Sequence, residues 1–282
     1  MTLSDNAAQI EYWNGKVGET WVRMQDRMDH ALGPVTAALL SLAAPQAGEQ
    51  VLDVGCGSGE TTLALAVAIG DDGAAVGLDV SEPLLARARE RADALLLDID
   101  FIAGDAAVFS DDSGYDLIVS RFGVMFFADP VAAFANLFRL AVPGARLCFA
   151  CWQMPADNLW ATLPMTVLAD LLPAQPAADP HAPGPFAFAD AERVATILTD
   201  AGWQDVIAHA LPFAMVTGSG DDPVADAVQF SLRIGPAARA VKEAGPQVEV
   251  AARQRLAEAL AGYRDGDHVA LPAAVWLFTA RA

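Results

Sequence analysis

Hydrophobic and polar positions follow two different rhythms along the chain. In residues 5–45, apolar side chains recur at the spacing of one helix face, at Ile10, Trp13, Val17 and Trp21. This pattern predicts helices near the N-terminus, although Gly15 and Gly18 weaken it. Gly33-Pro34 predicts a break, which is followed by a second short helix over Val35–Ala44.

From about residue 50, short β-rich runs alternate with longer runs rich in Ala and Leu. The predicted strands are Gln50–Val54, Ala75–Asp79, Asp100–Ala103, Tyr115–Ser120 and Ala145–Trp152. The predicted helices between them are Glu60–Ile69, Pro83–Leu97, with Ser81 as its N-cap, and Pro130–Ala141. This alternation predicts an α/β fold in which helices cover both faces of a parallel sheet.

Two segments interrupt the alternation. The first, 153–189, is rich in proline and partly helical over Trp160–Leu172, and the second, 218–265, includes a helical pattern over Ala251–Tyr263. The elements that remain are a helix over Asp190–Ala201 and strands over Asp205–Phe213 and Ala273–Thr279. Because these strands should rejoin the same sheet, we expect an N-terminal helical lid (1–48) and one domain (49–282) whose two insertions form a substrate cap.

Composition narrows the class of protein. The chain has 282 residues, of which 54% are hydrophobic and 19% are charged, as in a globular protein with a full core. Its net charge of −19 opposes binding to nucleic acids and to anionic membrane surfaces. A small-molecule partner is therefore expected. The sequence leaves open whether the chain is a monomer or a homodimer.

The number of cysteines and the N-terminal segment predict where in the cell the protein is found. Cys56, Cys148 and Cys151 cannot form a full disulfide framework. The first residues lack the pattern of a signal peptide, and no apolar run reaches the length of a membrane-spanning helix. We therefore expect a cytoplasmic protein.

Three glycines at alternate positions, Gly55, Gly57 and Gly59, lie between a predicted strand and a predicted helix. Glycine permits a tight turn and a close approach of the backbone to a ligand. Asp79 ends the next predicted strand, where a carboxylate can accept hydrogen bonds from ribose hydroxyls. Asp105 follows the third strand, where it could contact the edge of an adenine ring. Together these residues predict a nucleoside-binding site.

The spacing of these motifs resembles that of a known family. Asp53-Val54-Gly55-Cys56-Gly57-Ser58-Gly59 resembles the first motif of the class I S-adenosylmethionine-dependent methyltransferases of the small-molecule type. Asp79 resembles the acid of the second motif, Gly104-Asp105-Ala106 the adenine-edge motif, and Tyr115–Ser120 the fourth strand. The likeness is specific over roughly 48–152 and looser over the last two strands. It implies a Rossmann-like, seven-stranded, mostly parallel sheet with an antiparallel last strand.

The resemblance implies S-adenosylmethionine as the cofactor and S-adenosylhomocysteine as its product. Asp53 and the glycines would surround the methionine part, Asp79 would hold the ribose, and Ser120 would lie beside the amino acid end. Asp105 and the Ala106 N–H would bind the adenine, and Cys56 would be a small filler in the loop. The expected cofactor-binding set is Asp53, Gly55, Cys56, Gly57, Gly59, Asp79, Val80, Gly104, Asp105, Ala106 and Ser120.

Candidate acceptor residues follow the fourth strand, where the family has its acceptor pocket. They are Arg121, Phe122 and Met125, and Trp152 on the fifth strand joins them. This segment lacks the Asn-Pro-Pro-Tyr type of motif found in nucleic-acid amino-methylating enzymes. Tyr12, Trp13 and Trp21 could form a lid, or could belong to an amphipathic helix docked on the core. The insertion aromatics Trp160, Phe186, Phe188, Phe213 and Phe230 could line an apolar pocket or form the cores of the insertions.

The other conspicuous residues carry less information. Cys148 and Cys151 are three residues apart on a predicted strand, so their side chains should lie on opposite faces and simply pack. The four histidines show no zinc-ligand spacing, so no metal site is expected. His30 and His181 lie in segments that could overhang the pocket, which makes each a weak candidate for a general base, although a surface or structural role is the simpler interpretation.

The sequence therefore predicts methyl transfer from S-adenosylmethionine to a small, apolar metabolite by in-line displacement. One alternative is a non-catalytic protein that binds S-adenosylmethionine or S-adenosylhomocysteine. A second is an NAD-dependent oxidoreductase, which the glycine spacing and Gly104-Asp105-Ala106 disfavour. The acceptor and the accepting atom are not specified by the sequence.

Overall fold

The fold is built around one mixed sheet. The computed structural model describes residues 6–173 and 179–282. Over that part of the chain, the strand order is β3-β2-β1-β4-β5-β8-β6, with the two-residue β7 (Arg264–Asp265) paired to β8. The first five strands are parallel: β1 (Gln50–Val54), β2 (Ala74–Asp79), β3 (Asp100–Ala103), β4 (Tyr115–Arg121) and β5 (Ala141–Trp152). β8 (His268–Arg281) is antiparallel to β5 and to β6 (Gln204–Ser219). The predicted fold class is confirmed.

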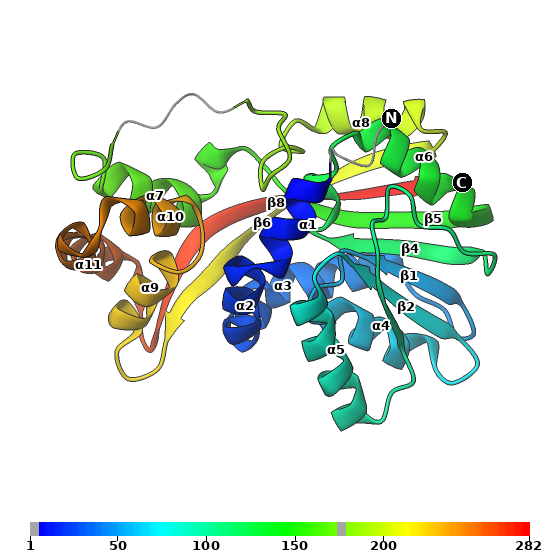
Figure 1. The fold of residues 1–282 in the computed structure, drawn as a ribbon, viewed down its shortest axis with the longest axis horizontal. Coiled ribbons are helices and arrows are strands. Elements are labelled where there is room, and N and C mark those ends of the chain that lie inside the picture. The colour runs from blue at the N-terminus through cyan, green and yellow to red at the C-terminus, as the bar shows by residue number, and fades with distance from the viewer. Residues whose placement is uncertain (1–5, 174–178) are drawn as a thin grey trace.

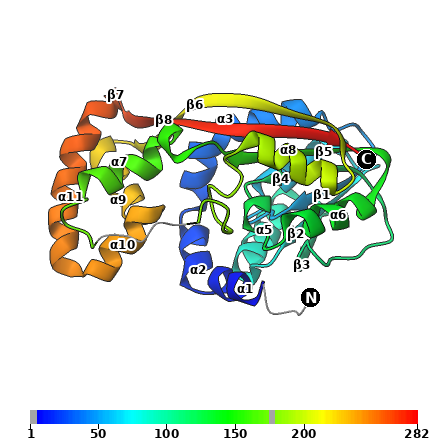
Figure 2. The same cartoon turned by 90° about the horizontal axis from the view of Figure 1, so that it is seen from above.

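Helices cover both faces of the sheet (Figures 1 and 2). α3 (Gln25–Ala43), α4 (Glu60–Ile69) and α5 (Glu82–Leu95) pack on one face, and α6 (Pro130–Leu140) and α8 (Ala191–Asp200) pack on the other. Leu52, Ile118 and Phe149 lie on central strands and are fully buried between these layers. The central strands are apolar because helices cover both of their faces.

The N-terminal region consists of α1 (Ala7–Asn14), α2 (Lys16–Arg23) and α3. The predicted break at Gly33-Pro34 is wrong, since Pro34 lies inside α3. The buried stripe continues past the proline, through Leu32, Val35 and Leu39. Burial of this stripe outweighs the one helical hydrogen bond that Pro34 cannot donate.

A long hairpin carries the second insertion away from the sheet. β6 has 16 residues and β8 has 14, so both extend beyond the predicted Asp205–Phe213 and Ala273–Thr279. The start of β8 precedes the predicted strand, and Val269 and Leu271 there are buried in the main core cluster. α9 (Pro223–Ser231), α10 (Pro236–Ala244), α11 (Pro246–Leu260) and the short η3 (Ala261–Tyr263) lie at the end of this hairpin (Figure 1).

The two insertions pack together, although many residues separate them in the sequence. The first insertion contains the short η2 (Pro155–Asp157) and α7 (Leu159–Val167), and α7 contacts α10, α11 and β8. Arg255 of α11 donates hydrogen bonds to the Asp170 carboxylate just beyond α7, one of them 2.9 Å long. None of the described helices is long and apolar enough to span a membrane.

Candidate functional site

The glycine loop leaves β1 at the carboxyl edge of the parallel strands. Gly55, Gly57 and Gly59 all have left-handed backbone angles, with φ of 67°, 56° and 83°. This conformation is strained for any residue with a side chain, which explains why glycines recur at these positions. A Cβ on Gly57 would meet no atom of the described residues within 4 Å. The loop therefore presents open backbone at Gly57, as the approach of a ligand requires.

The segment after β4 packs directly against this loop. A Cβ on Gly55 would lie 2.5 Å from Gly123 Cα, so two glycines face each other at close range. Phe122, just before Gly123, has a φ of 69°, which is strained for a bulky residue. Its ring stacks on Trp152 with 4.6 Å between the ring centroids. Two of the expected acceptor residues are thus held together beside the loop.

Asp53 is a buried carboxylate at the base of the site. It is 1% exposed, and its Oδ2 accepts a hydrogen bond of 2.7 Å from Thr62 Oγ1. Its Oδ1 is buried and has no hydrogen-bond partner in the structure. Burial raises the pKa of Asp53 to about 7, against the smaller opposing effects of Thr62 and Arg121. A buried carboxylate with a free oxygen is suited to a cationic or N–H donor ligand.

Asp79 lies at the end of β2 and already orders the neighbouring backbone. Its two carboxylate oxygens accept hydrogen bonds of 2.8 Å from the Gly57 and Ser81 N–H groups. Burial raises the pKa of Asp79. Each carboxylate oxygen can accept a second hydrogen bond, so Asp79 can hold the glycine loop and also accept from ribose hydroxyls.

The third expected acid, Asp105, lies beyond the end of β3. Its Oδ1 accepts from the Ala107 N–H (3.0 Å), and its Oδ2 accepts from Asn6 Nδ2 (2.6 Å). The Gly104 N–H donates to the Asp79 carbonyl at 2.9 Å, which links the two acidic positions. Asn136 Nδ2 on α6 donates to the Ala106 carbonyl. The three acids therefore line the same edge of the sheet.

The N-terminal helices contact this edge through polar anchors. Asn14 Nδ2 donates to the Val80 carbonyl (2.7 Å), and Asn14 Oδ1 accepts from the Glu82 N–H (3.0 Å). Ser81 occupies the N-cap position of α5, as predicted, but its Oγ donates to the Trp13 carbonyl at 2.8 Å and makes no capping hydrogen bond to the helix. Together with the bond from Asn6 to Asp105, these contacts fix the N-terminal segment over the ends of β2 and β3.

Aromatic contacts complete the docking of these helices. The Trp13 ring makes edge contacts with Tyr12, Trp21 and Phe126, at centroid distances of 5.6, 5.7 and 5.4 Å. Phe126 belongs to the short helix η1 (Val124–Phe126) that follows β4. The predicted lid aromatics thus lie next to the segment expected to bind the acceptor.

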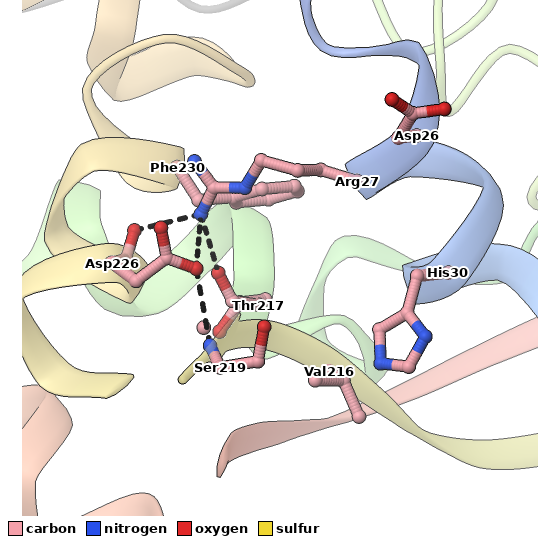
Figure 3. A pocket seen from close by; sticks show the side chains of 9 residues that line it. Asp26, Arg27, His30, Val216, Thr217, Ser219, Asp226 and Phe230 are labelled. Carbon is pink, nitrogen blue, oxygen red and sulfur yellow. Dashed lines mark hydrogen bonds and ion pairs between the residues drawn. The ribbon is translucent and has the colours of Figure 1, made fainter. Parts of the chain in front are cut away.

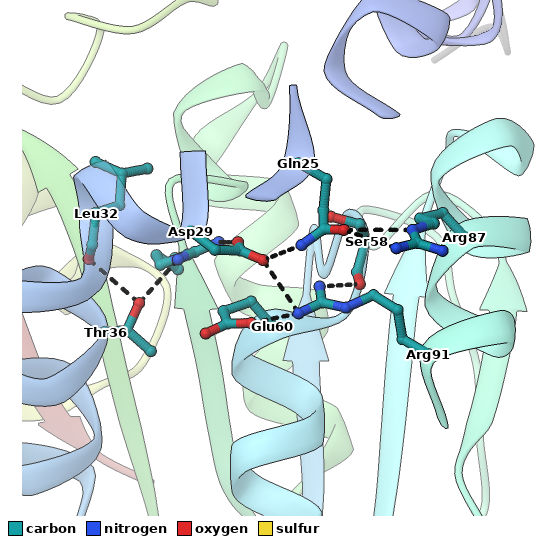
Figure 4. Close-up of polar contacts among 9 residues, drawn as sticks. Gln25, Asp29, Leu32, Thr36, Ser58, Glu60, Arg87 and Arg91 are labelled. Atoms are coloured by element: carbon teal, nitrogen blue, oxygen red, sulfur yellow. Dashed lines mark hydrogen bonds and ion pairs between the residues drawn. The ribbon is translucent and has the colours of Figure 1, made fainter. Parts of the chain in front are cut away.

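A partly buried charge network joins α3 to the glycine loop (Figure 4). Asp29 pairs with Arg91 (3.1 Å) and with Arg121 (3.4 Å), and it accepts a hydrogen bond from Gln25. Arg91 pairs with Glu60 and donates to the Ser58 carbonyl at 2.7 Å. The network fixes the loop backbone and places positive charge near Asp53.

Several predicted site residues have mainly structural contacts. Ser120 Oγ donates to the Val54 carbonyl (2.7 Å) and accepts from the Gly123 N–H (3.1 Å), so it joins β1 to the segment after β4. Arg121 is bound to Asp29 and Thr36 on α3. The Cys56 thiol packs in a small core cluster with Leu63 and Phe101, and burial raises its pKa.

The remaining candidates lie around the insertions. Met125 is buried, and its carbonyl accepts from the Gly184 N–H of the first insertion. His181 is exposed three residues before Gly184. His30 lies on the hairpin side of α3, in a cavity that also contains Arg27 and Asp226. Neither histidine contacts the acids of the site in the structure, so their role as bases stays a prediction.

The insertion aromatics are largely core. Trp160, Phe188 and Phe230 are at most 7% exposed, and Trp152 stacks against Phe213 as well as Phe122. The two strand cysteines behave as predicted: Cys148 Sγ contacts the Leu39 carbonyl of α3, and Cys151 Sγ contacts the Phe188 carbonyl in the first insertion. Burial raises the pKa of Cys148 to about 12, so this thiol stays protonated at neutral pH.

Sequence reasoning missed several residues of this region. They are Asn6 and Asn14 on the N-terminal segment, Asp29 and Arg91 in the charge network, and Gly123 after β4. Only Gly123 carries a signal, since a glycine two residues after a buried strand is consistent with close backbone contact. The other four act through partners that are distant in the sequence.

Comparisons with known proteins agree with this geometry. A family model described as a methyltransferase domain matches residues 51–144. Demethylmenaquinone methyltransferase from Renibacterium salmoninarum is 32% identical over 169 residues, which cover 56% of this chain and 68% of that protein. Nocamycin O-methyltransferase from Saccharothrix syringae is 33% identical over 138 residues, which cover 48% of this chain and 49% of that protein. The chain spans about half the length of several other curated relatives that it matches.

Solved structures share the fold. Phosphoethanolamine N-methyltransferase 2 from Haemonchus contortus, in complex with S-adenosylmethionine, gives a TM-score of 0.52 at 15% identity. The match covers 88% of this chain and 52% of that chain. The sheet order, the glycine loop, the family model and the relative from Renibacterium salmoninarum lead to one assignment. The chain belongs to the class I S-adenosylmethionine-dependent methyltransferase family.

Proposed function

We propose that this protein transfers a methyl group from S-adenosylmethionine to a small, apolar metabolite. The observation that carries the proposal is Asp53, a buried carboxylate with one unpartnered oxygen. It lies at the base of a glycine loop whose backbone is open at Gly57, and Asp79 anchors that loop. A cationic amino acid end and a ribose match this set of groups, so the residues fit the cofactor.

The residues of this chain would then bind and orient. Asp53 and the glycine loop hold the methionine end, Asp79 the ribose, and Asp105 with the Ala106 N–H the adenine. S-adenosylmethionine supplies a methyl group already activated on a positively charged sulfur. The protein's remaining task is to hold the acceptor in line and to exclude water, which gives a large entropic advantage without a catalytic triad.

The acceptor would lie between the N-terminal helices and the segment after β4. Trp13 and Phe122 provide aromatic side chains there, as small-molecule sites usually do, and the buried Trp152 supports the Phe122 ring. The names of the curated relatives, which act on demethylmenaquinone and in nocamycin methylation, support a small organic acceptor. We extend the proposal to the predicted domains: residues 1–48 form the lid, and the two insertions form the cap of one domain.

Two alternative functions, a non-catalytic binding protein and an oxidoreductase, can be distinguished by measuring methyl transfer and ligand binding. A protein that only binds S-adenosylmethionine or S-adenosylhomocysteine would use the same site, but it would release no S-adenosylhomocysteine with any acceptor. An oxidoreductase would bind NAD, which the family assignment disfavours. Formation of S-adenosylhomocysteine with a panel of phenols, acids and amines therefore supports the methyltransferase proposal. A chain that binds both sulfur compounds and turns over none of the panel supports the binding protein.

Removal of the proposed ribose acid should weaken cofactor binding. We expect Asp79→Ala to lower the affinity for S-adenosylmethionine by about 1–3 kcal/mol, because ribose hydroxyls and the Gly57 N–H lose their acceptor. Calorimetric titration measures this effect, and Asp98→Ala, at an exposed loop position, is the control. Equal affinities for Asp79→Ala and the wild type, with the same circular dichroism spectrum, would refute the ribose assignment.

Cofactor affinity should depend on pH through Asp53. Its pKa in the free protein is about 7, and the carboxylate form is the one that attracts a cationic ligand. Lowering the pH from 8 to 6 protonates most of this group, so the apparent affinity should fall about tenfold. Titrations at several pH values test this. A pH-independent dissociation constant over this range would show that Asp53 does not face the cofactor.

A further inference from the structure

A cavity of about 260 Å³ lies between the N-terminal helices and the second insertion. Its lining consists of Thr20, Arg23, Met24 and Arg233. Arg23 is the last residue of α2, and Arg233 follows α9, so the two arginines come from the N-terminal helices and from the second insertion. Figures 1 and 2 both place α2 between the sheet and the helices of the second insertion.

The charge around this cavity is unusual for the chain. The protein has a net charge of −19, yet two arginines converge here. Arg23 donates to Thr20 Oγ1 at 3.1 Å, and its ion pair with Glu19 is long (3.9 Å) and mostly exposed. Arg233 contacts Met24 Sδ at 3.8 Å. Among the described residues, neither guanidinium has a carboxylate at short range, so both can donate to an anion that enters the cavity.

A third arginine nearby shows the contrast (Figure 3). Arg27 pairs with Asp226 at 2.8 Å and donates to the Asp226 and Thr217 carbonyls. Its guanidinium also lies over the Phe230 ring, 5.6 Å from the centroid. These contacts join α3 to the second insertion, and they pair the charge of Arg27 with a carboxylate. Within the described part of the chain, the neighbouring Arg23 and Arg233 have only the weak or uncharged contacts given above.

The cavity is close to the proposed cofactor site. Gly18, five residues before Arg23 on α2, packs against Ser81 at the end of β2, where its Cβ would lie 3.1 Å from Ser81 Oγ. Five helical residues span about 7.5 Å along the axis. The cavity and the contact with Ser81 therefore lie within about two turns of the same helix, α2.

We propose that the methyl acceptor carries an oxyanion group, a carboxylate or a phosphate, which Arg23 and Arg233 bind in this cavity. The proposal rests on the proposed function and names its substrate class: an apolar body with one anionic end. The planar guanidinium can bind either a carboxylate or a phosphate through two parallel N–H groups. A neutral acceptor has no charged oxygen to accept these hydrogen bonds. Thr20 and Met24 provide a hydroxyl and an apolar wall on the same cavity.

Matched probes test the charge requirement directly. We would titrate the full chain, with S-adenosylhomocysteine bound, with 4-hydroxybenzoate, decanoate and phenyl phosphate, and with 4-hydroxybenzamide, decanamide and phenol as neutral counterparts. We expect at least one anion to bind about tenfold or more tighter than its counterpart. Arg23→Gln and Arg233→Gln should each remove most of that difference, because each takes away one charge-assisted contact. Comparing the affinity for 4-hydroxybenzoate with that for phenyl phosphate shows whether the cavity prefers a carboxylate or a phosphate.

Controls separate this proposal from the proposed function. Arg239→Gln, at an exposed arginine paired with Glu243 on α10, should leave the anion affinities unchanged. Arg23→Gln and Arg233→Gln should bind S-adenosylmethionine as the wild type does, since neither residue is part of the cofactor site. Anions that bind no better than their neutral counterparts, or equally well to the two variants, overturn the anionic-acceptor proposal. They leave the methyltransferase proposal intact. That proposal fails if the wild type does not bind S-adenosylmethionine, or if it binds it and methylates no acceptor.

Discussion

Asp53→Asn should change cofactor affinity and stability in opposite directions. The amide keeps an acceptor for Thr62 Oγ1 but loses the negative charge, so we expect S-adenosylmethionine to bind about 10- to 100-fold more weakly. The free protein should become more stable at pH 8. Burial raises the pKa of Asp53 from 3.8 to about 7, so ionising it costs free energy in the folded state, with an upper limit of roughly 4 kcal/mol.

The sign of the pH effect follows from proton binding. Between about pH 4 and 7 the folded protein holds a proton on Asp53 that the unfolded chain releases. The free energy of unfolding of the wild type therefore has a component that falls as the pH rises through this window. Asp53→Asn lacks this component, and its melting temperature should exceed that of the wild type most at pH 8.

Thermal unfolding and calorimetric titration at pH 6 and pH 8 measure both effects. Asp71→Asn, at an exposed turn position, is the control for loss of one negative charge. A variant that loses stability without losing cofactor affinity would show that Asp53 is a structural acid. A variant that keeps full affinity would remove it from the cofactor site.

Gly57→Ala should impair cofactor binding much more than it impairs folding. Gly57 has a φ of 56°, and an added Cβ meets no atom within 4 Å in the described part of the chain. The left-handed conformation costs roughly 1–2 kcal/mol for a residue with a side chain. In the proposed complex the side chain added by Gly57→Ala would occupy space that the cofactor fills. Such overpacking typically costs a further 1–3 kcal/mol, here of binding free energy.

Gly144→Ala is the matched control. Gly144, near the start of β5, has a φ of 85° and also has open space around its missing Cβ. Both variants should lose a similar amount of stability, but only Gly57→Ala should lose affinity for S-adenosylmethionine, by tenfold or more. Equal affinities in the two variants would mean that the open backbone at Gly57 does not face the cofactor.

Local patterns were sufficient for most of the sheet. The predicted helix Glu60–Ile69 and the predicted strand Asp100–Ala103 match the structure to the residue. Their ends are marked by glycines or polar residues, and their apolar runs match the period of the element that forms. The glycine loop was found for the same reason, since its φ requirement is local and only glycine meets it without strain.

Contacts between distant segments could not be predicted in this way. The helix through Pro34 and the long hairpin depend on burial against elements elsewhere in the chain. The pair Arg255–Asp170, which joins the two insertions, has no local signal at either residue. The same is true of Asn14 and Asp29, whose partners lie on α5, on β4 and in the loop after β2.

The central claim is that this chain binds S-adenosylmethionine at the carboxyl edge of β1 and β2. The most direct test is thermal unfolding of the wild type with S-adenosylmethionine, S-adenosylhomocysteine or NAD. A ligand at 100 times its dissociation constant adds about 2.7 kcal/mol to the free energy of unfolding, so the melting temperature should rise by several degrees with both sulfur compounds. NAD should produce no shift. A shift with NAD alone, or no shift with either sulfur compound, would contradict the claim.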